Sequence, residues 1–463
     1  MESLHENCES YRLVVTRRNA SEILLWPNGS GWALPRVEIR RQQRVAEQLT
    51  SEVSRRWGLQ AYCLFVPSHP TSGRNDEAKY AVLESVTQDS AAPAGTNWMP
   101  RTVATGPGVA EEAGAVSASL EELDSYASGE RPGPFARPGW LRELFEWVQE
   151  QIGPLGLRVT GGFRQWNASP TFSLMRLETD ADALWFKATG EPNTHELPVS
   201  LLLARLFPGH VPRVLGVHET WNGWLSAEAP GSALDELSDS SAWERAAKEL
   251  AELQIASIGK GAELLEGGCK DLRIPKLVEL IDPFLARMAE FMAVQEKRSP
   301  APLADSELVS LGEGLKESCS LLQSFGLQDT LGHIDFNPGN ILVSSDSCVF
   351  LDWAEGCVSN PLITFEYVRE HIGRSSVQEP SALERLTAGY VRPWTSFYSP
   401  DDLRRALAVS PLIAVFTYAI ASDAWRTPDS INNPELAGYF RSLTRRMYRE
   451  AIHAAERSEL CLD

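Results

Sequence analysis

The apolar positions near the start of the chain change from strand-like to helix-like spacing and back. Within residues 11–26, two runs of β-branched and aromatic residues flank Arg18 to Ala20, which predicts two short strands around a turn. Apolar residues then recur at helical spacing from Val45 to Trp57, and Gly58 ends the pattern. The strand-like segments that follow are 61–67 and 79–84. The pattern predicts a small α/β domain over residues 1–100.

The next part of the chain contains a segment rich in small residues, followed by a segment in which apolar residues recur at regular spacing. Residues 91–138 are rich in Ala, Gly, Pro, Ser and Glu, which predicts a loose connection with a short helix at 120–127. The sequence WLRELFEWVQEQI, from Trp140, has the spacing of an amphipathic helix. Residues 101–150 are therefore interpreted as a linker and a connecting helix.

The remaining sequence separates into a strand-rich and a helix-rich part. Residues 157–190 alternate between apolar and polar positions and predict three antiparallel strands, with a turn at Gly161–Gly162 after the first. Helical patterns dominate from about Trp243 onward. The clearest of them are 242–258, 275–292 and 307–325. The predicted class is α+β, with a β-rich lobe at 151–230 and a helical lobe at 231–463.

Charge and cysteine content narrow the classes of function. The 463 residues include 43 basic and 62 acidic side chains, for a net charge of −19, which disfavours binding to nucleic acid or to an anionic membrane surface. The charge would attract a cationic substrate, or it simply keeps the protein soluble. The seven cysteines form no CxxC pair, so neither a disulfide framework nor a zinc site is indicated.

No membrane segment is expected either. The first residues, MESLHENCESYRL, carry charges where a signal peptide needs an apolar core. The long apolar stretch from Ala408 is interrupted by Ser410, Pro411 and Asp423, which indicates a buried helix and not a bilayer span. Together with the cysteine usage, these features predict a cytoplasmic protein.

The stretch LGHIDFNPGNILVSSDSCVFLDWAEG, residues 331–356, carries the strongest chemical signal. Transfer of a γ-phosphoryl group needs a carboxylate that accepts the proton of the attacking hydroxyl, oxygen ligands for Mg²⁺ and a cation on the phosphates. Asp335 can be that carboxylate, and the loop that follows can return the amide oxygen of Asn340 to a metal. After a predicted short hairpin, Asp352 stands at a strand end, where it could also bind Mg²⁺.

These segments, GHIDFNPGNILV and FLDWAEG, resemble the catalytic and metal-binding segments of the aminoglycoside phosphotransferase and choline kinase-like superfamily, relatives of the protein kinases. The resemblance implies a two-lobed protein-kinase-like fold with ATP and Mg²⁺ as cofactors. It implies that Asp335 is the catalytic base and that Asn340 and Asp352 are magnesium ligands. It also implies that Lys187 holds the α- and β-phosphates and that Glu196 pairs with Lys187.

Simpler interpretations of the upstream residues remain open. Lys187 could be a strand-edge lysine in water, and Glu196 an acid favoured by the helix dipole. Gly161 and Gly162 could let the backbone approach phosphates, or could form a plain hairpin turn. The segment GWLSAEAPGSAL, from Gly223, resembles the hinge between kinase lobes, where backbone groups of Ala227 to Ala229 would meet adenine.

The chain departs from the superfamily pattern at three positions. Ile334 replaces a common glycine, and Asn337 stands where a second histidine is frequent. Thr364 lies near the place of an aspartate that supports the loop in the family. His333 is interpreted as a structural hydrogen-bonding residue and not as a base.

The run GWALPRVEIRRQQRVAEQLTSEVSRRWGLQA, from Gly31, resembles the Nudix hydrolase motif. In this alignment Val37 replaces the first glycine, Gln43 the first glutamate, and Arg55 and Arg56 the glutamate pair, so that only Glu52 remains. Two cations would repel Mg²⁺, so the resemblance implies a degenerate Nudix-like fold without hydrolysis. The arginines could form an ordinary solvated face. Alternatively, an anion or partner could be bound by Arg40, Arg41, Arg55 and Arg56.

The leading hypothesis is an ATP- and Mg²⁺-dependent phosphotransferase that acts on a hydroxyl of a small molecule. The acceptor could be cationic, since acidic residues could line a pocket for it, or it could be a sugar, an amino acid or another metabolite. Those acidic residues are Glu355, Glu366, Glu370 and Asp423.

A second hypothesis is a non-catalytic regulatory protein that binds a nucleotide or metabolite on a kinase-like scaffold. A protein acceptor is disfavoured, because no long segment ending in APE follows Asp352. The oligomeric state stays open.

Overall fold

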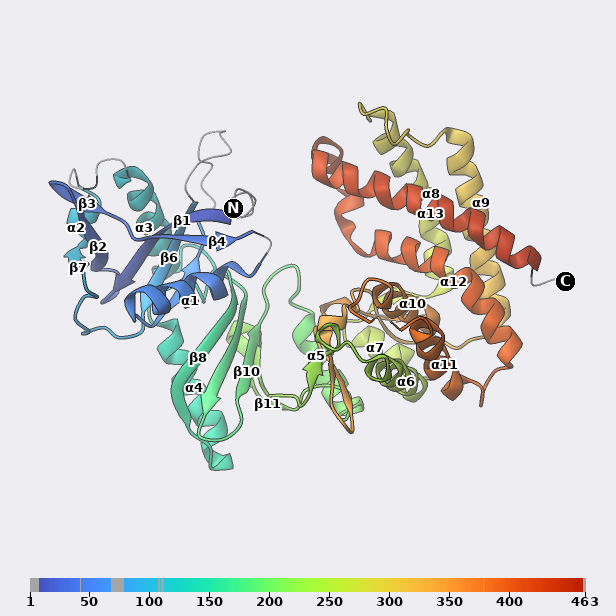
Figure 1. The fold of residues 1–463 in the computed structure, drawn as a ribbon, viewed down its shortest axis with the longest axis horizontal. Helices are drawn as coiled ribbons and strands as arrows, with labels where there is room; N and C mark the ends of the chain where they lie inside the picture. The colour runs from blue at the N-terminus through green and yellow to red at the C-terminus, as the bar shows by residue number, and fades with distance from the viewer. Residues whose placement is uncertain are drawn as a thin grey trace. The chain divides into compact units, whose positions relative to one another are not determined.

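The computed structural model describes residues 8–41, 43–67, 79–106, 109, 112–377 and 379–460 (Figure 1). The chain forms two compact units. Unit 1 consists of Met1–Leu197 and Arg213–Glu228, and unit 2 of Pro198–Pro212 and Ala229–Asp463. The predicted first domain, the connecting segment and most of the predicted β-rich lobe fall within unit 1. The boundaries drawn between these three parts remain predictions.

A mixed seven-stranded sheet opens unit 1. Its strands are β1 (Cys8–Arg17), β2 (Glu22–Asn28), β3 (Gly31–Ala33), β4 (Arg36–Arg40), β5 (Ala61–Phe65), β6 (Lys79–Ser85) and β7 (Asn97–Pro100). The main order is β3-β2-β1-β6-β5, β4 pairs with β1 and β7 with β2, and β1 runs parallel to β6. Helix α1 (Val45–Trp57) ends at Gly58, whose φ of 60° suits a glycine. The predicted strand pair, helix and two further strands are confirmed.

Alternate residues of this sheet enter two different hydrophobic cores. On β1, Leu13 and Val15 pack in the core that contains Leu49 and Val53 of α1. Val14, between them, points into the second core. The side-chain alternation of a strand explains this division, because neighbouring residues face opposite sides of a sheet. The sheet is therefore covered on both faces.

Within 91–138, the residues that the structure describes form regular elements, so the prediction of a loose connection is wrong. The segment contains β7, the short helix α2 (Arg101–Ala104) and the helix α3 (Ala113–Ala127), which is longer than predicted. Leu120 and Leu123 of α3 are buried in the second core. Alanine is common in linkers but is also the best helix former, so composition alone did not separate the two states.

A second, antiparallel sheet completes unit 1. Its strands, in the order β11-β12-β10-β9-β8, are β8 (Val159–Ala168), β9 (Ser173–Thr179), β10 (Leu184–Ala188), β11 (Val214–His218) and β12 (Gly223–Ala227). The three predicted antiparallel strands are confirmed as β8, β9 and β10. The turn predicted at Gly161–Gly162 is wrong, because both glycines lie inside β8 and the chain reverses near Ser169, whose hydroxyl accepts a 3.0 Å hydrogen bond from the N–H of Phe172.

The two sheets of unit 1 share one core. Trp140 of helix α4 (Trp140–Ile152), Phe135 and Phe186 of β10 are buried together with Val14 of the first sheet. A polar contact adds to this apolar joint. The buried side chain of Gln165 on β8 donates to the Cys63 carbonyl of β5 at 2.9 Å and accepts from the Cys63 N–H at 2.7 Å. Residues from the predicted domain and lobe are thus held together by packing and by paired hydrogen bonds.

Unit 2 is mainly helical, as predicted. Its longer helices are α6 (Ser240–Ala256), α8 (Ile274–Ala293), α9 (Asp305–Ser324), α10 (Pro361–Ile372), α11 (Ala382–Trp394), α12 (Pro400–Ala421) and α13 (Pro434–Leu460). Shorter helical elements are α7 (Gly261–Glu266) and the part of α5 (Glu196–Leu206) that begins at Pro198. Two small sheets contain the strands next to Asp335, Asn340 and Asp352. Their strand orders are β13-β16-β17 and β14-β18-β15.

The strands of these two sheets are short. They are β13 (Ser232–Ala233), β14 (Lys270–Leu272), β15 (Thr330–His333), β16 (Ile341–Val343), β17 (Cys348–Phe350) and β18 (Gly356–Ser359). Helix α12 is long and apolar enough to cross a membrane by length and composition alone, but 67% of its apolar window is buried in unit 2. The stretch from Ala408 is therefore a core helix, as predicted.

We expect Gln165→Ala to destabilise unit 1. The substitution leaves the Cys63 N–H and carbonyl without their partners, at a cost of about 1–3 kcal/mol for each group left unpaired. Urea unfolding followed by tryptophan fluorescence measures the change, with the exposed Gln60→Ala as the matched control. Equal stability of the two variants would contradict the role given to the Gln165 amide.

A second buried polar group in unit 1 makes stability depend on pH. Glu84 of β6 is buried and accepts hydrogen bonds from the Tyr62 hydroxyl and, at 2.7 Å, from the Gly139 N–H. Burial raises the pKa of Glu84 above its ordinary value, despite these hydrogen bonds. The folded state then binds the proton more tightly than the unfolded state does, so the contribution of Glu84 to stability is largest at low pH and is lost as pH rises.

We therefore expect Glu84→Gln to change how stability depends on pH. The stability of the variant minus that of the wild type should be larger at about pH 7.5 than at about pH 5.5. Lowering the pH protonates the buried Glu84 carboxylate and so stabilises the wild type but not the variant. Urea titrations of both proteins at the two pH values give the comparison. The same stability difference at both values would show that the carboxyl titrates normally.

Candidate active site

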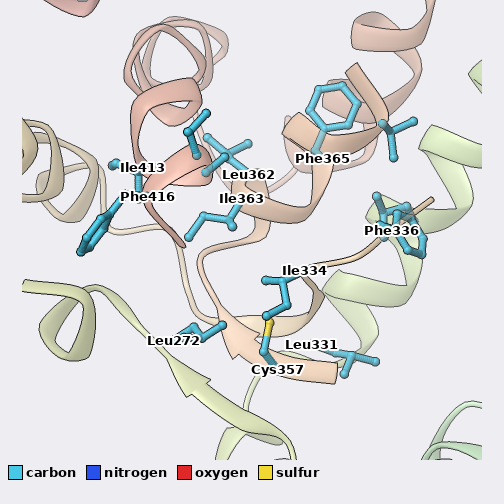
Figure 2. Packing of buried hydrophobic residues seen from close by; sticks show 14 of the residues in the cluster. Leu272, Leu331, Ile334, Phe336, Cys357, Leu362, Ile363, Phe365, Ile413 and Phe416 are labelled. Carbon is cyan, nitrogen blue, oxygen red and sulfur yellow. The ribbon is translucent and has the colours of Figure 1, made fainter. Parts of the chain in front are cut away.

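The loop after β15 sends alternate side chains inward and outward. Ile334 and Phe336 are buried in the core of unit 2, whereas Asp335 and Asn337 are exposed. Figure 2 shows Ile334 beside Cys357 of β18 within this hydrophobic cluster. The backbone is fixed as well, because the Ile334 N–H donates to the Glu355 carbonyl at 3.2 Å. Packing of the apolar neighbours therefore holds the Asp335 carboxylate at the surface on a fixed backbone.

The next turn brings the other two predicted residues together. The Asn337 side chain accepts a hydrogen bond from the Gly339 N–H at 3.2 Å and caps the short helix Pro338–Asn340. The carbonyl of Asn340 then accepts from the N–H of Leu351 at 2.8 Å. Because Leu351 directly precedes Asp352, this bond places Asp352 beside Asn340. Asp352 adopts φ 63° and ψ 57°, a left-handed conformation that aspartate tolerates better than most residues.

His333 connects the backbone at Asp335 with the backbone at Asp352. Its Nδ1 accepts a hydrogen bond from the Asp335 N–H at 3.2 Å, and its Nε2 lies 2.8 Å from the Asp352 carbonyl oxygen. Because a carbonyl can only accept, the proton is on Nε2 and the imidazole is neutral. Burial lowers the pKa of His333, which keeps it in that state. The interpretation of His333 as a structural residue agrees with these contacts.

The three departures from the superfamily pattern each have a structural account. Ile334 is not among the described non-glycine residues with positive φ, so the missing glycine costs no backbone strain. Asn337 caps the turn that carries Asn340. Thr364 is buried on α10, and its hydroxyl accepts a hydrogen bond from the His333 N–H at 2.9 Å. Thr364 thus supports the loop, a role that the sequence alone did not reveal.

Lys187 and Glu196 form an ion pair within unit 1. Lys187 lies on β10, between β9 and β12, and its Nζ is 5.8 Å from the centroid of the Trp224 ring. The side chains of Lys187 and Glu196 are only 15% and 2% exposed. The alternative of a strand-edge lysine in water is therefore wrong. Removing both charged groups from water is costly, so stability alone is a weak reason for a buried ion pair here.

The glycines and the hinge fit their predicted roles less directly. Gly161 has φ 85°, and a Cβ at Gly162 would lie 2.2 Å from a carboxylate oxygen of Glu178 on β9, so the Glu178 side chain would have to move to admit one. At the hinge, the N–H of Ala227 already donates to the Arg213 carbonyl at 2.9 Å. The following N–H, of Glu228, donates to the Ala183 carbonyl. The hydrogen bonds found among the described residues include none from the N–H of Ala229.

The four acidic residues considered for a cation pocket each have a basic partner. Glu355 lies 2.6 Å from Lys270, and Asp423 lies 3.1 Å from Arg426. The remaining ion pairs are Glu366 with Arg369 and Glu370 with Arg446. Internal charge pairing therefore accounts for these acids, and nothing in their arrangement sets them aside for a cationic acceptor. Lys270 is far away in the sequence, and no local pattern identified it as the partner of Glu355.

In the segment that resembles the Nudix motif, the acidic residue is also paired with basic side chains. Glu52 is 2.6 Å from Arg55 and 2.7 Å from Arg56, and the hydrogen bond from Arg55 is the main cause that lowers the pKa of Glu52. Val37 is buried and Gln43 is exposed, and neither offers a carboxylate. The hollow beside them has a volume of about 770 Å³ and is lined by both signs of charge, including Arg40, Arg44, Glu47, Glu52 and Arg56.

Comparison with known proteins gives similarities only among solved structures. No family model matches the chain, and no curated protein matches it. A macrolide 2'-phosphotransferase from Brachybacterium faecium is 17% identical, with a TM-score of 0.43, covering 63% of this chain and 98% of that chain. The Plasmodium vivax ethanolamine kinase is 14% identical, with a TM-score of 0.46 and coverage of 72% and 95%.

A choline/ethanolamine kinase family protein from Mesorhizobium loti is 15% identical, with a TM-score of 0.43, covering 67% of this chain and 98% of that chain. At such identities and scores, the activities of these proteins do not transfer to this chain. The function must be argued from the residues of the chain itself.

We expect Thr364→Val to destabilise the loop that carries Asp335. Valine keeps the shape but leaves the buried His333 N–H without an acceptor, which costs about 1–3 kcal/mol. Urea unfolding of unit 2 measures this loss. The matched control is Thr417→Val, since the Thr417 hydroxyl is also buried but only bonds the Ile413 carbonyl of its own helix. Equal losses in the two variants would mean that the Thr364 hydroxyl has no special supporting role.

Proposed function

We propose that this chain is an ATP- and Mg²⁺-dependent phosphotransferase that acts on a hydroxyl group of a small molecule. The observation that carries the proposal is the frame built around His333. Through it an exposed carboxylate, Asp335, is held on the same hydrogen-bonded scaffold as Asp352. The bond between the Leu351 N–H and the Asn340 carbonyl adds the third residue to that scaffold.

The donor set suits a magnesium ion that is shared with phosphates. Mg²⁺ prefers oxygen ligands and is usually bound by one or two side chains together with phosphate oxygens. The amide oxygen of Asn340 and the carboxylate of Asp352 are such ligands. No group of three or more His, Cys, Asp or Glu side chains gathers as a metal site in the part of the chain that the structure describes. When bound, Mg²⁺ would neutralise charge on the phosphates.

The remaining residues have defined tasks in the proposal. Lys187, oriented by Glu196, would hold the α- and β-phosphates of ATP. Asp335 orients the acceptor hydroxyl and takes its proton while the acceptor oxygen forms a bond to the γ-phosphorus. The bond from that phosphorus to the bridging oxygen breaks, and ADP leaves with the electron pair. Asp335 then releases the proton to water, so that the enzyme returns to its starting state.

A small acceptor fits the chain after Asp352 better than a protein does. From Asp352 the chain passes through the short helix Trp353–Glu355 and β18 directly into α10 at Pro361. No long segment that could dock a protein substrate separates these elements. The acid pairing described above removes the reason to favour a cation, so the acceptor is defined only as a small molecule with a hydroxyl.

The regulatory alternative is less well supported. A scaffold that only binds a nucleotide could use the Lys187–Glu196 pair, but it has no need of a surface carboxylate fixed by His333. For residues 1–100 we propose a Nudix-like domain without hydrolase activity, because its remaining motif glutamate, Glu52, is paired with two arginines. We also propose a cytoplasmic location, on the basis of the cysteine usage.

We expect Asp335→Asn to reduce turnover by about 10²–10⁴-fold, since the amide cannot accept the acceptor proton. The affinity for ATP should stay nearly unchanged. Asp352→Ala should instead weaken Mg²⁺-dependent ATP binding. Calorimetric titration with ATP, with and without Mg²⁺, and release of ADP measure both effects. Asp346→Asn, on the exposed turn of the same hairpin, is the matched control.

Two outcomes would overturn the proposal in different ways. Undiminished turnover in Asp335→Asn would remove Asp335 from the role of base. A wild-type protein that binds no ATP at millimolar concentration would favour the regulatory alternative.

A further inference from the structure

The face of the second sheet that carries Lys187 also carries a tryptophan. Along β10 the side chains of Leu184 and Phe186 are buried in the shared core of unit 1, and Trp185 and Lys187 alternate with them. Because neighbouring residues of a strand face opposite sides of the sheet, Trp185 and Lys187 lie on the same face, roughly 7 Å apart along the strand. The Trp185 side chain therefore borders the space in which Lys187 would hold phosphates.

A second tryptophan reaches the first from two strands away. Trp166 lies on β8, which β9 separates from β10, yet the ring centroids of Trp166 and Trp185 are 4.7 Å apart. The register of β8 against β9 shifts between Gln165 and Asn167, so Trp166 is the extra residue of a β-bulge. Bulges re-aim side chains and are frequent beside active sites. We call Trp166 and Trp185 the tryptophan pair.

Two arginine side chains hold the Trp166 ring. The Cζ atom of Arg164, on β8 itself, lies 4.3 Å from the ring centroid. The Cζ atom of Arg44, the residue directly before α1, lies 5.5 Å from the same centroid. A guanidinium over an aromatic ring is attracted by the negative charge of the ring face. Trp166 is therefore held both from its own strand and from the start of a helix in the predicted first domain.

Glu47 of α1 connects these two arginines. Its carboxylate forms an ion pair with Arg164 and lies 4.0 Å from the Arg44 guanidinium. Helix α1 packs against β8 (Figure 1), and the Glu47 side chain is only 18% exposed. The contacts thus run from Glu47 through the two guanidinium groups to the tryptophan pair and end beside Lys187.

Cations on this face are each held by a carboxylate from another element. In the strand registers, Arg176 of β9 lies opposite both Arg164 and Trp185, so these residues share the face of Lys187. The ion pairs are Lys187 with Glu196 of α5, Arg176 with Glu228 after β12, and Arg164 with Glu47 of α1. Glu47 therefore orients the cation next to Trp166 as Glu196 orients Lys187.

Joining the two sheets is a weak reason for the Glu47–Arg164 pair. The Arg164 side chain is 61% exposed, and exposed ion pairs add little to stability. The neighbouring Gln165 already joins the sheets through paired hydrogen bonds to Cys63. A use in binding is better supported, because a side chain that is fixed before a ligand arrives need not be ordered when the ligand binds.

We propose that Glu47 is a positioning residue for the nucleotide site, because through Arg164 and Trp166 it fixes Trp185 beside Lys187. A residue of the predicted first domain thereby raises the affinity of the phosphotransferase for MgATP. The inference rests on the proposed function, since it takes Lys187 as the residue that holds the phosphates of ATP.

The first test replaces the Glu47 carboxylate alone. Glu47→Gln should raise the Kd for MgATP about two- to tenfold, because a freed side chain must then be ordered on binding. Calorimetric titration measures the Kd. The matched control is Glu52→Gln on the same helix, whose Kd should equal that of the wild type. The Glu52 side chain is similarly covered, at 24% exposed, but pairs with Arg55 and Arg56.

The second test asks whether the effect passes through Trp166. Trp166→Leu should also raise the Kd for MgATP. Adding Glu47→Gln to that variant should change the Kd no further, because the contact that Glu47 supports is already gone. Urea unfolding shows whether each variant is folded. Additive effects of the two substitutions on the Kd would contradict a path through Trp166.

The possible failures can be told apart. If the wild type binds no MgATP at millimolar concentration, the proposed function fails and the positioning role fails with it. If the wild type binds MgATP and Glu47→Gln binds it equally well, only the positioning role is lost. A Glu47→Gln variant that is less stable but keeps the wild-type Kd would show that Glu47 only joins the two sheets.

Discussion

The neutral imidazole of His333 is the interaction on which the proposed site depends. A buried ring can bind two backbone groups in opposite directions only if one nitrogen accepts and the other donates, and this is the arrangement at Asp335 and Asp352. Protonation would remove the acceptor at Nδ1, and burial lowers the pKa of His333 and so opposes that change. Two exposed carboxylates are thus positioned by one uncharged group between them, without a buried charge.

This frame is rigid because its surroundings are apolar except where a hydrogen bond is needed. Ile334 and Phe336 are in close-packed core, and a packed core resists small displacements. Thr364 supplies the one polar contact that the His333 N–H requires. The Lys187–Glu196 pair in unit 1 is similar, because its buried carboxylate contacts and orients one cation. Both sets place polar groups where the proposed phosphoryl transfer would use them.

The sequence predicted what depends on local spacing and missed what depends on distant partners. Periodicity located the strands and helices, and the spacing from Asp335 to Asn340 and Asp352 matched a loop and hairpin that the structure contains. A Gly-Gly pair, in contrast, is compatible with a turn or with a strand interior, and only pairing with β9 decides. Partners such as Lys270 for Glu355 lie far apart in the chain, so no local pattern reveals them.

The shared core of unit 1 shows that the first sheet contributes to the packing of the second sheet. Val14 and Phe65 of the first sheet are buried with Phe186 of β10, the strand that carries Lys187. Gln165 adds hydrogen bonds between β5 and β8 across the same joint. Without the first sheet, this face of the Lys187 sheet would be exposed to water, at about 25 cal/mol for each Å² of apolar surface. The first sheet is therefore part of the support of the neighbouring sheet, whose hydrophobic face it covers.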